Sequence, residues 1–218
     1  MTISSRKAST LSLDPPRDCA LCPRLAAFLA GNRAAHPDWH NAPVPAFGPL
    51  DASLLIVGLA PGLKGANRTG RPFTGDYAGD LLYATLLKLG LAKGTYQQRP
   101  DDGLQLLGCR ITNAVRCVPP ENKPTPAEAK ACGSFLVKEI AALPNMKSIL
   151  VLGRISHEAS LRALGQKPSA YAFGHAKIHV LPTGIRLIDS YHCSRYNTQT
   201  NRLTPVMFEE AVRAAALN

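Results

Sequence analysis

No stretch of the sequence is apolar for long enough to cross a membrane, which takes about 18 consecutive apolar residues. The amino end also has no apolar segment of the kind that a secretory signal carries behind its basic residues. Residues 1–13 combine two basic residues with many Ser and Thr, and we expect them to form a disordered tail. These absences favour a cytoplasmic protein that has no membrane among its partners.

Acidic residues are scarce, since 15 Asp and Glu stand against 25 Lys and Arg, and the formal net charge is +10. A charge of this size favours a polyanionic partner, and we prefer nucleic acid over a basic surface that is merely solvated. Aromatic residues make up only 6% of the chain, which weighs against a module that stacks single-stranded bases. A phosphoesterase would need clustered acids for metal ions, and the loops offer only Asp76 and Asp189.

Short apolar runs alternate with helical periodicity along the 218 residues, a length that suits one buried domain rather than two. The alternation predicts an α/β fold, a mostly parallel sheet with helices on both faces, in a single domain over residues 14–218. The expected strands cover 53–57, 105–115, 148–152, 178–181 and 186–189. The expected helices cover 81–89, 127–143, 155–164 and 205–216, with one more after Cys22.

The segment from Gly58 to Asp76 is the most informative part of the chain. Five glycines, an aromatic residue and one acid follow directly after the apolar run 53–57, which has the composition of a strand buried on both faces. Ligands of open α/β sheets bind where the strands end, and glycines there let the backbone approach a ligand closely. We therefore expect an active-site loop whose single carboxylate is Asp76.

Two more strands are expected to end in residues that suit a binding site. Asn113 lies near the end of the second strand, and an amide that both donates and accepts can read the edge of a base. His192 follows the last strand in a polar, basic and aromatic loop. We favour a functional role for both residues over a turn asparagine and a structural histidine.

Six cysteines give the second strong signal. Cys19 and Cys22 form a Cys-x-x-Cys pair near the amino end, and Cys117 and Cys132 flank a proline-rich loop. Four thiolates from two such segments suit zinc or an iron–sulfur cluster, and the residues alone put the cluster only modestly ahead. A redox disulfide is less favoured, because the pair precedes the first strand and does not cap one. Cys109 lies inside a strand, which favours a core thiol.

These motifs resemble those of the family 5 (type b) uracil-DNA glycosylases, in the iron–sulfur-containing branch of the uracil-DNA glycosylase superfamily. The resemblance extends from Cys19 to Leu203. It rests on Gly58–Gly62, Gly65–Asp76, Asn113–Cys117, and His192 with Ser194 and Asn197. It implies a three-layer α/β/α sandwich and a [4Fe–4S] cluster on Cys19, Cys22, Cys117 and Cys132. Where the family usually has His-Pro-Ser, this chain has Cys193 in place of the proline, and we expect a less rigid loop.

The resemblance also implies the activity, excision of uracil from DNA, often with hypoxanthine or xanthine as further substrates. The partner is then DNA that contains uracil or other deaminated bases. A monomer suffices, because one flipped base needs one pocket, and in a prokaryote such a protein associates with the nucleoid. The alternative that remains is a nucleic-acid-binding protein with a structural metal site and no chemistry.

Breaking an N-glycosidic bond develops positive charge on the sugar and negative charge on the base. Asp76 suits positioning a water and stabilising the sugar, whereas His192 can donate to the base oxygen. Asn113 can bond to the base edge, and Phe73 can stack on its face. The expected substrate-binding residues are Gly58, Leu59, Ala60, Pro61, Gly62 and Phe73. The expected DNA contacts are Lys64, Arg68, Ser194, Arg195 and Tyr196, the last two as a wedge in the space that the flipped base leaves.

Overall fold

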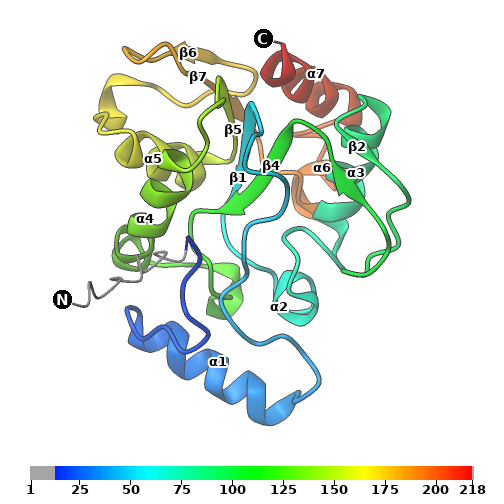
Figure 1. Ribbon diagram of the computed structural model, residues 1–218, viewed down its shortest axis with the longest axis vertical. Coiled ribbons are helices and arrows are strands. Elements are labelled where there is room, and N and C mark those ends of the chain that lie inside the picture. Colours follow the sequence, from blue (N-terminus) through cyan, green and yellow to red (C-terminus); the bar gives the residue numbers. More distant parts are fainter. Residues whose placement is uncertain (1–12, 218) are drawn as a thin grey trace, which may run out of the picture.

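The computed structural model describes residues 13–217, and in it a five-stranded sheet lies between two layers of helices (Figure 1). The strand order is β4-β1-β5-β7-β6, and all neighbours pair in parallel except the edge strand β6, which is antiparallel to β7. The strands are β1 (Leu54–Gly58), β4 (Cys109–Asn113), β5 (Ser148–Leu152), β6 (Ile178–Val180) and β7 (Arg186–Ser190). The expected three-layer α/β/α sandwich is confirmed.

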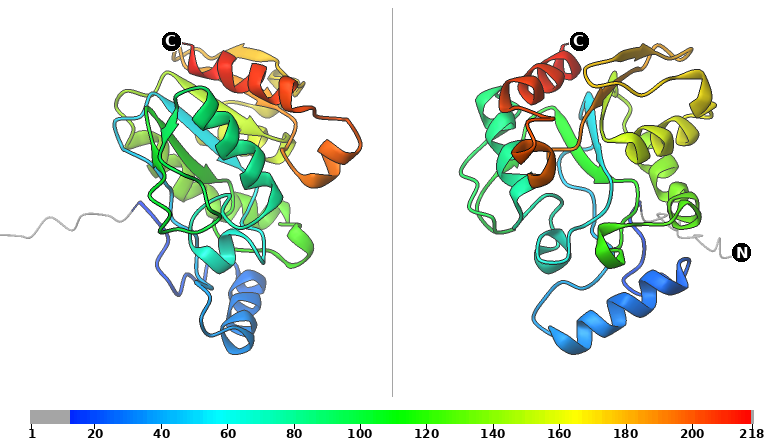
Figure 2. Two further views of the ribbon diagram at one scale, coloured as in Figure 1. Left: turned by 90° about the vertical axis from the view of Figure 1, so that its right-hand side faces the viewer. Right: turned by 180° about the vertical axis from the view of Figure 1, so that it is seen from behind.

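Helices cover both faces of this sheet. On one face, α3 (Tyr77–Lys88) packs beside α7 (Pro205–Ala216), and on the other α4 (Pro126–Ala141) packs beside α5 (Arg154–Ala163). A further helix, α1 (Pro23–Ala35), lies at the end of the molecule away from α7 (Figure 2). It packs against the segment around Val115 and Val118 through Leu25 and Leu29. The helices predicted from periodicity all form, within a few residues of the expected bounds.

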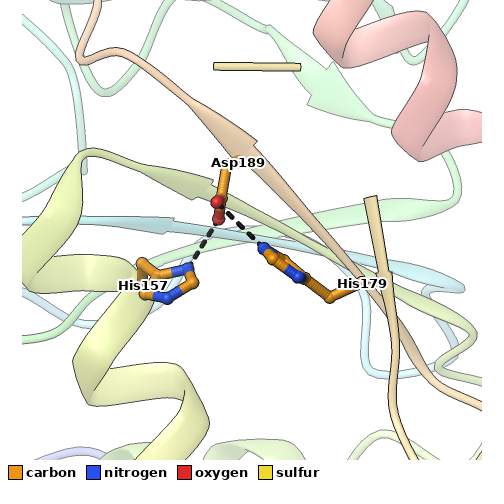
Figure 3. A group of neighbouring side chains, drawn as sticks. All are labelled: His157, His179 and Asp189. Atoms are coloured by element: carbon orange, nitrogen blue, oxygen red, sulfur yellow. Dashed lines mark hydrogen bonds and ion pairs between the residues drawn. The ribbon is translucent and has the colours of Figure 1, made fainter. Parts of the chain in front are cut away.

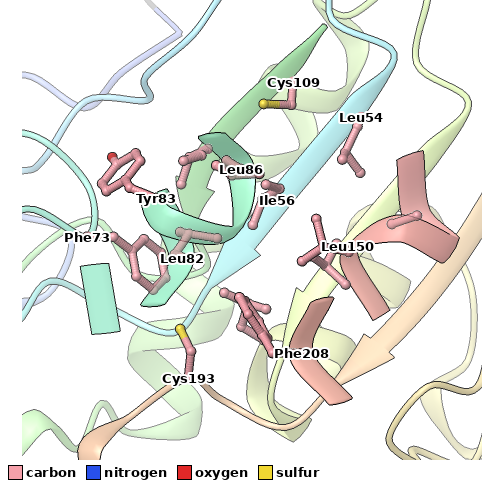
Figure 4. Close-up of a cluster of buried hydrophobic side chains, with 14 of the residues drawn as sticks. Leu54, Ile56, Phe73, Leu82, Tyr83, Leu86, Cys109, Leu150, Cys193 and Phe208 are labelled. Carbon is pink, nitrogen blue, oxygen red and sulfur yellow. The ribbon is translucent and has the colours of Figure 1, made fainter. Parts of the chain in front are cut away.

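Nearly every residue of the parallel strands is buried, because each face of the sheet meets a helical layer. Along β1, Leu54 and Ile56 point into the core under α3 and α7, which Figure 4 shows, whereas Leu55 and Val57 point into the core under α4 and α5. All five residues of this strand are buried. Truncating one such leucine to alanine typically costs about 2–5 kcal/mol of stability. The sheet is therefore a rigid base for the loops at its carboxyl edge.

One expected strand divides in two. Residues 105–115 form β3 (Gln105–Leu106), which pairs antiparallel with β2 (Ala92–Lys93), and then β4 in the main sheet. The chain turns between them at Gly108, whose φ of +64° is a conformation that favours glycine. Apolar residues continue to alternate through this turn, so the turn could not be recognised from the sequence pattern.

Two short α-helices of the described chain were not expected. One is α2 (Ala66–Thr69) inside the glycine loop, and the other is α6 (Arg195–Gln199) after the last strand. Ser194 caps α6, because its hydroxyl accepts a hydrogen bond from the Asn197 backbone N–H at 3.4 Å. Both are too short for periodicity to reveal.

Caps fix where the longer helices begin. Thr125 and Glu128 form a reciprocal capping box at the start of α4, and Glu128 also pairs with Arg24 of α1 at 2.8 Å. The side chain of Asp76 caps α3 by accepting the Gly79 N–H at 3.2 Å. Within residues 13–217, no helix is long and apolar enough to cross a membrane. The expectation of a tail over 1–13 concerns residues that, except for Leu13, lie outside the described range.

Candidate active site

A cavity of about 460 Å³ lies at the carboxyl edge of the sheet, around the ends of β1 and β4 and the segment after β7. It gathers the three residues expected to act on the substrate, Asp76, Asn113 and His192. Ten of the expected site residues line it, and four more that were not expected join them. The full lining is Leu59, Ala60, Pro61, Gly62, Ala66, Phe73, Asp76, Tyr77, Ala78, Asn113, Asn122, His192, Ser194 and Arg195.

Gly58 lies behind the cavity, and its lack of a side chain makes room for two residues of the cavity wall. It pairs in register with Asn113 across β1 and β4. A Cβ at Gly58 would lie 2.3 Å from Oδ1 of Asn113 and 2.5 Å from Cζ of Phe73, closer than atoms of real side chains come. The amide and the aromatic ring can therefore share this corner only because residue 58 is glycine.

Asp76 has one carboxylate oxygen engaged and the other directed at the glycine loop. Its Oδ1 accepts from the Gly79 N–H, while a Cβ at Gly62 or Gly65 would lie only 2.9 or 2.3 Å from its Oδ2. Burial raises the pKa of this carboxyl, and the hydrogen bond from Gly79 opposes the rise. The loop can therefore lie close to this oxygen only because residues 62 and 65 are glycine.

Asn113 and His192 offer polar atoms to the cavity. Asn113 is 3% exposed, and its amide has no hydrogen-bond partner among the described residues. Burial lowers the pKa of His192 to about 4, so its imidazole is neutral at neutral pH and carries one N–H donor. The side chain of Asn197 donates to the His192 carbonyl at 2.8 Å and holds that backbone in place.

Phe73 serves both as a core residue and as part of the cavity wall. It is 7% exposed and packs into the core beneath α3, yet it also lines the cavity. Its ring centroid lies 6.1 Å from that of His192, with the planes 27° apart. Cys193 is fully buried and lies below Phe73 in the view of Figure 4, and its thiol lies 3.5 Å from the Ala78 carbonyl oxygen. The residue in place of the usual proline is therefore packed into the core.

The expected DNA contacts lie at and around the mouth. Lys64 and Arg68 are exposed and do not line the cavity, and Tyr196 stands out from α6 with 71% of its surface exposed. Arg195 lines the cavity and lies over the ring of Tyr77 at 5.4 Å. In the described part of the chain, no acidic side chain forms an ion pair with Lys64, Arg68 or Arg195.

Asn122 is the polar lining residue that the sequence did not suggest. It ends a short 3-10 turn, Pro120–Asn122, in the proline-rich loop, and its φ of +56° is one that asparagine tolerates better than most residues. The loop starts just after Cys117 and reaches the cavity from β4. Its prolines indicated a turn, but nothing in them indicated which side chain would face the cavity.

Asp189 does not belong to this cavity. It is fully buried on β7, where it bonds to Nδ1 of His157 at 2.7 Å and Nε2 of His179 at 3.1 Å (Figure 3). The other ring nitrogen of His157 lies 2.8 Å from the Tyr171 carbonyl oxygen. These are hydrogen-bond distances, shorter than the separation of two ligands around one ion with bonds of about 2 Å. The group ties α5 and β6 to β7.

Four cysteines line a second, small cavity beside α1. Cys19 and Cys22 come from the segment before that helix, Cys117 follows β4, and Cys132 lies in α4. Burial raises the pKa of Cys117 to about 12 and that of Cys132 to about 11, and the Arg116 N–H donates to the Cys132 sulfur at 3.3 Å. Apolar residues complete the lining, namely Pro15, Leu21, Leu25, Val115 and Phe135. Four sulfurs on one cavity are a donor set that suits zinc or an iron–sulfur cluster.

The chain is similar in sequence to known uracil-DNA glycosylases. A family model described as the uracil DNA glycosylase superfamily matches residues 45–216. A type-5 uracil-DNA glycosylase of Thermus thermophilus is 47% identical over 203 residues, which cover 90% of this chain and 92% of that protein. One of Pyrobaculum aerophilum is 38% identical over 91% of this chain and 88% of its own length. A type-4 enzyme of Thermotoga maritima is 33% identical over 77% of this chain and 78% of its own length.

Proposed function

Because this chain belongs to the uracil DNA glycosylase superfamily, we propose that it hydrolyses the N-glycosidic bond of uracil in DNA and leaves an abasic site for repair. The observation that carries the proposal is the cavity at the sheet edge. It combines a carboxylate, a nearly buried amide that has no partner in the described chain, and a neutral imidazole. These are the groups that separation of a base from its sugar requires.

Asp76 acts on the sugar side of the bond. As positive charge develops on the sugar, an ionised carboxylate next to it lowers the energy of the transition state and can orient the attacking water. The cap bond from Gly79 holds the carboxylate in one direction, and Gly62 and Gly65 carry no side chain that would displace its second oxygen. Position and charge therefore suit this role.

His192 and Asn113 act on the base side. Negative charge builds on the departing base. The imidazole of His192 is neutral, and its N–H can donate a hydrogen bond to the base oxygen as that charge develops. The Asn113 amide can donate and accept at once, which suits the edge of uracil. Asn122 reaches the same cavity and is a third polar group that can contact the base.

The target base has to leave the helix to enter this cavity. We extend the proposal to base flipping, with the Phe73 ring against the base face and Arg195 and Tyr196 in the space left behind. Lys64, Arg68 and Ser194 contact the phosphate backbone of the DNA near the mouth of the cavity. One chain supplies the whole cavity, which supports a monomer.

Other deaminated bases are further proposed substrates. A volume of about 460 Å³ exceeds what one pyrimidine fills, and Leu59 and Ala60 present no polar group that a larger base would have to match. Hypoxanthine and xanthine therefore belong to the proposed range. Relative rates on the three bases test this extension.

The four cysteines at the second cavity are proposed to hold a [4Fe–4S] cluster. Protonated thiols with pKa values of about 11 and 12 become ligands only if metal displaces their protons, and the surrounding apolar side chains suit a buried cluster. Cys19 and Cys22 before α1, Cys117 after β4 and Cys132 in α4 would hold the cluster and so be tied to one another. This fixes the loop that carries Asn122 to the cavity wall.

The test is incubation of the purified protein with a 5′-labelled duplex that contains one uracil. Free uracil, together with strand cleavage only after hot alkali, supports the proposal. Binding without product would instead identify a nucleic-acid-binding protein with a structural metal. Strand cleavage without alkali would instead identify a phosphoesterase or lyase activity.

A further inference from the structure

The turn that carries Phe73 has an unusual backbone. Phe73 has a φ of +52°, in the left-handed region that bulky side chains rarely adopt. Such a conformation persists only where the surrounding structure holds it, typically at functional sites. The groups that hold Phe73 are therefore candidates for positioning its ring against the substrate.

The hydroxyl of Tyr96 binds the backbone on both sides of this turn. It donates to the Phe73 carbonyl oxygen at 3.1 Å and accepts from the Gly75 N–H at 3.4 Å. Gly79 in the first turn of α3 closes the same space, since a Cβ there would lie 1.8 Å from the Phe73 oxygen and 2.6 Å from the Tyr96 hydroxyl. The hydroxyl therefore sits in a tight contact between the turn and α3.

The ring of Tyr96 is held independently of its hydroxyl. It packs against the ring of Tyr83 with centroids 4.6 Å apart, and the guanidinium of Arg71 lies 5.8 Å from its centre. Arg71 in turn pairs with Asp102 at 2.8 and 2.7 Å, and Asp102 accepts from the Gln97 N–H next to Tyr96. Removing the hydroxyl alone would leave this aromatic and ionic packing in place.

We infer that Tyr96 is a positioning residue for base excision: its hydroxyl holds the Phe73 backbone in the left-handed turn and so directs the Phe73 ring at the flipped base. The inference rests on the proposed role of Phe73. Without the two bonds, the backbone can relax to a negative φ and the ring turns from the cavity wall. Burial raises the pKa of Tyr96 to about 12, so the hydroxyl keeps its proton throughout the neutral range.

The first test is Tyr96→Phe, measured as the single-turnover rate of uracil release at saturating enzyme. We expect the rate to fall about tenfold, with the affinity for undamaged duplex within twofold of wild type. Tyr171→Phe is the matched control, because it also removes one hydroxyl, bonded at 3.2 Å to Gln166 and outside the active-site cavity. The control should keep the wild-type rate. An unchanged rate in Tyr96→Phe would overturn the inference.

A double-mutant cycle separates positioning from a general structural effect. In a Phe73→Ala background, which has no ring to direct, Tyr96→Phe should slow the reaction by less than twofold. A further tenfold loss in that background would overturn the inference and leave the proposed role of Phe73 standing. A Phe73→Ala protein with the wild-type rate would refute the role of Phe73 itself, and with it this inference.

Discussion

Gly58 and Asn113 are register partners on adjacent strands, and a single added carbon on Gly58 would lie 2.3 Å from the Asn113 amide oxygen. The absent side chain is what allows the amide and the Phe73 ring to form one wall of the cavity. The strand pairing and the site chemistry are therefore linked at this position.

Gly58→Ala should lower the rate of uracil release at least tenfold, because the added carbon displaces Asn113, Phe73 or both. Gly31→Ala in α1 is the control, since a Cβ there meets nothing within 4 Å. It should keep full activity and raise stability by about 0.5–1 kcal/mol, as glycine is unfavourable inside helices. Single-turnover kinetics and thermal unfolding measure the two effects. Full activity of Gly58→Ala would show that the wall does not depend on this contact.

The pKa of His192, lowered by burial to about 4, predicts a pH dependence of stability. An exposed histidine has a pKa of about 6.5, so between these values the unfolded chain binds a proton that the folded protein does not. The free energy of unfolding should therefore rise with pH from about 4 to 6.5 through this group and level off above. Asp76, with its raised pKa, acts in the opposite direction as the pH rises above the ordinary aspartate pKa of about 3.9.

Denaturant unfolding of wild type and His192→Gln across this pH range isolates the histidine, and the variant should show the shallower rise. NMR titration of the ring measures its pKa directly. A midpoint near 6.5 would mean that His192 is solvated, and the neutral-donor role would lose its basis.

The cluster proposal predicts a brown protein with broad absorbance near about 400 nm from thiolate-to-iron charge transfer. Cys117→Ser should lose the colour and lower the solubility. Without this ligand, the cluster no longer ties the proline-rich loop after Cys117 to the segment before α1. Cys109→Ser should keep both, since that thiol is buried in the main core and its sulfur lies 3.3 Å from the Leu91 carbonyl oxygen. Colourless protein that contains stoichiometric zinc would contradict the proposed iron–sulfur cluster but would support metal binding by the four cysteines.

Arg195→Ala should weaken binding to a duplex with an abasic site more than binding to an undamaged duplex. A wedge fills the stack only where a base has left it, so its contact forms only in the flipped complex. Lys64→Ala, at the mouth but off the cavity, should weaken both alike and reduce the salt dependence of binding. Equal losses from Arg195→Ala on the two duplexes would make it an ordinary phosphate contact.

Much of the fold and of the active-site cavity could be predicted from the sequence, because the residue patterns that indicate them are local. The apolar runs of β1 and β5 and the proline and glycine limits of the helices predicted the sandwich, and the polar ends of strands predicted where Asp76, Asn113 and His192 meet. The resemblance supplied the rest of the expected site. The division at Gly108 escaped because apolar residues continue through the turn.

The parts that could not be predicted depend on contacts between distant segments. Tyr96 meets Phe73 across 23 residues of chain, and no spacing rule connects them. Asn122 faces the cavity through its left-handed backbone. Asp189 carried the signal of a loop acid but is buried, because His157 and His179 bond to it from two other elements.

The proposed reaction depends most on the Asp76 carboxylate, which acts on the sugar during uracil release. Asp76 also caps α3, and Asn caps a helix as well as Asp does, so Asp76→Asn removes the charge and keeps the cap. Asp80→Asn, in the first turn of the same helix, is the control. Single-turnover excision on a uracil duplex should fall by about two orders of magnitude or more in Asp76→Asn, with duplex binding nearly unchanged, and stay near wild type in the control. A fully active Asp76→Asn protein would show that the carboxylate charge is not needed for uracil release.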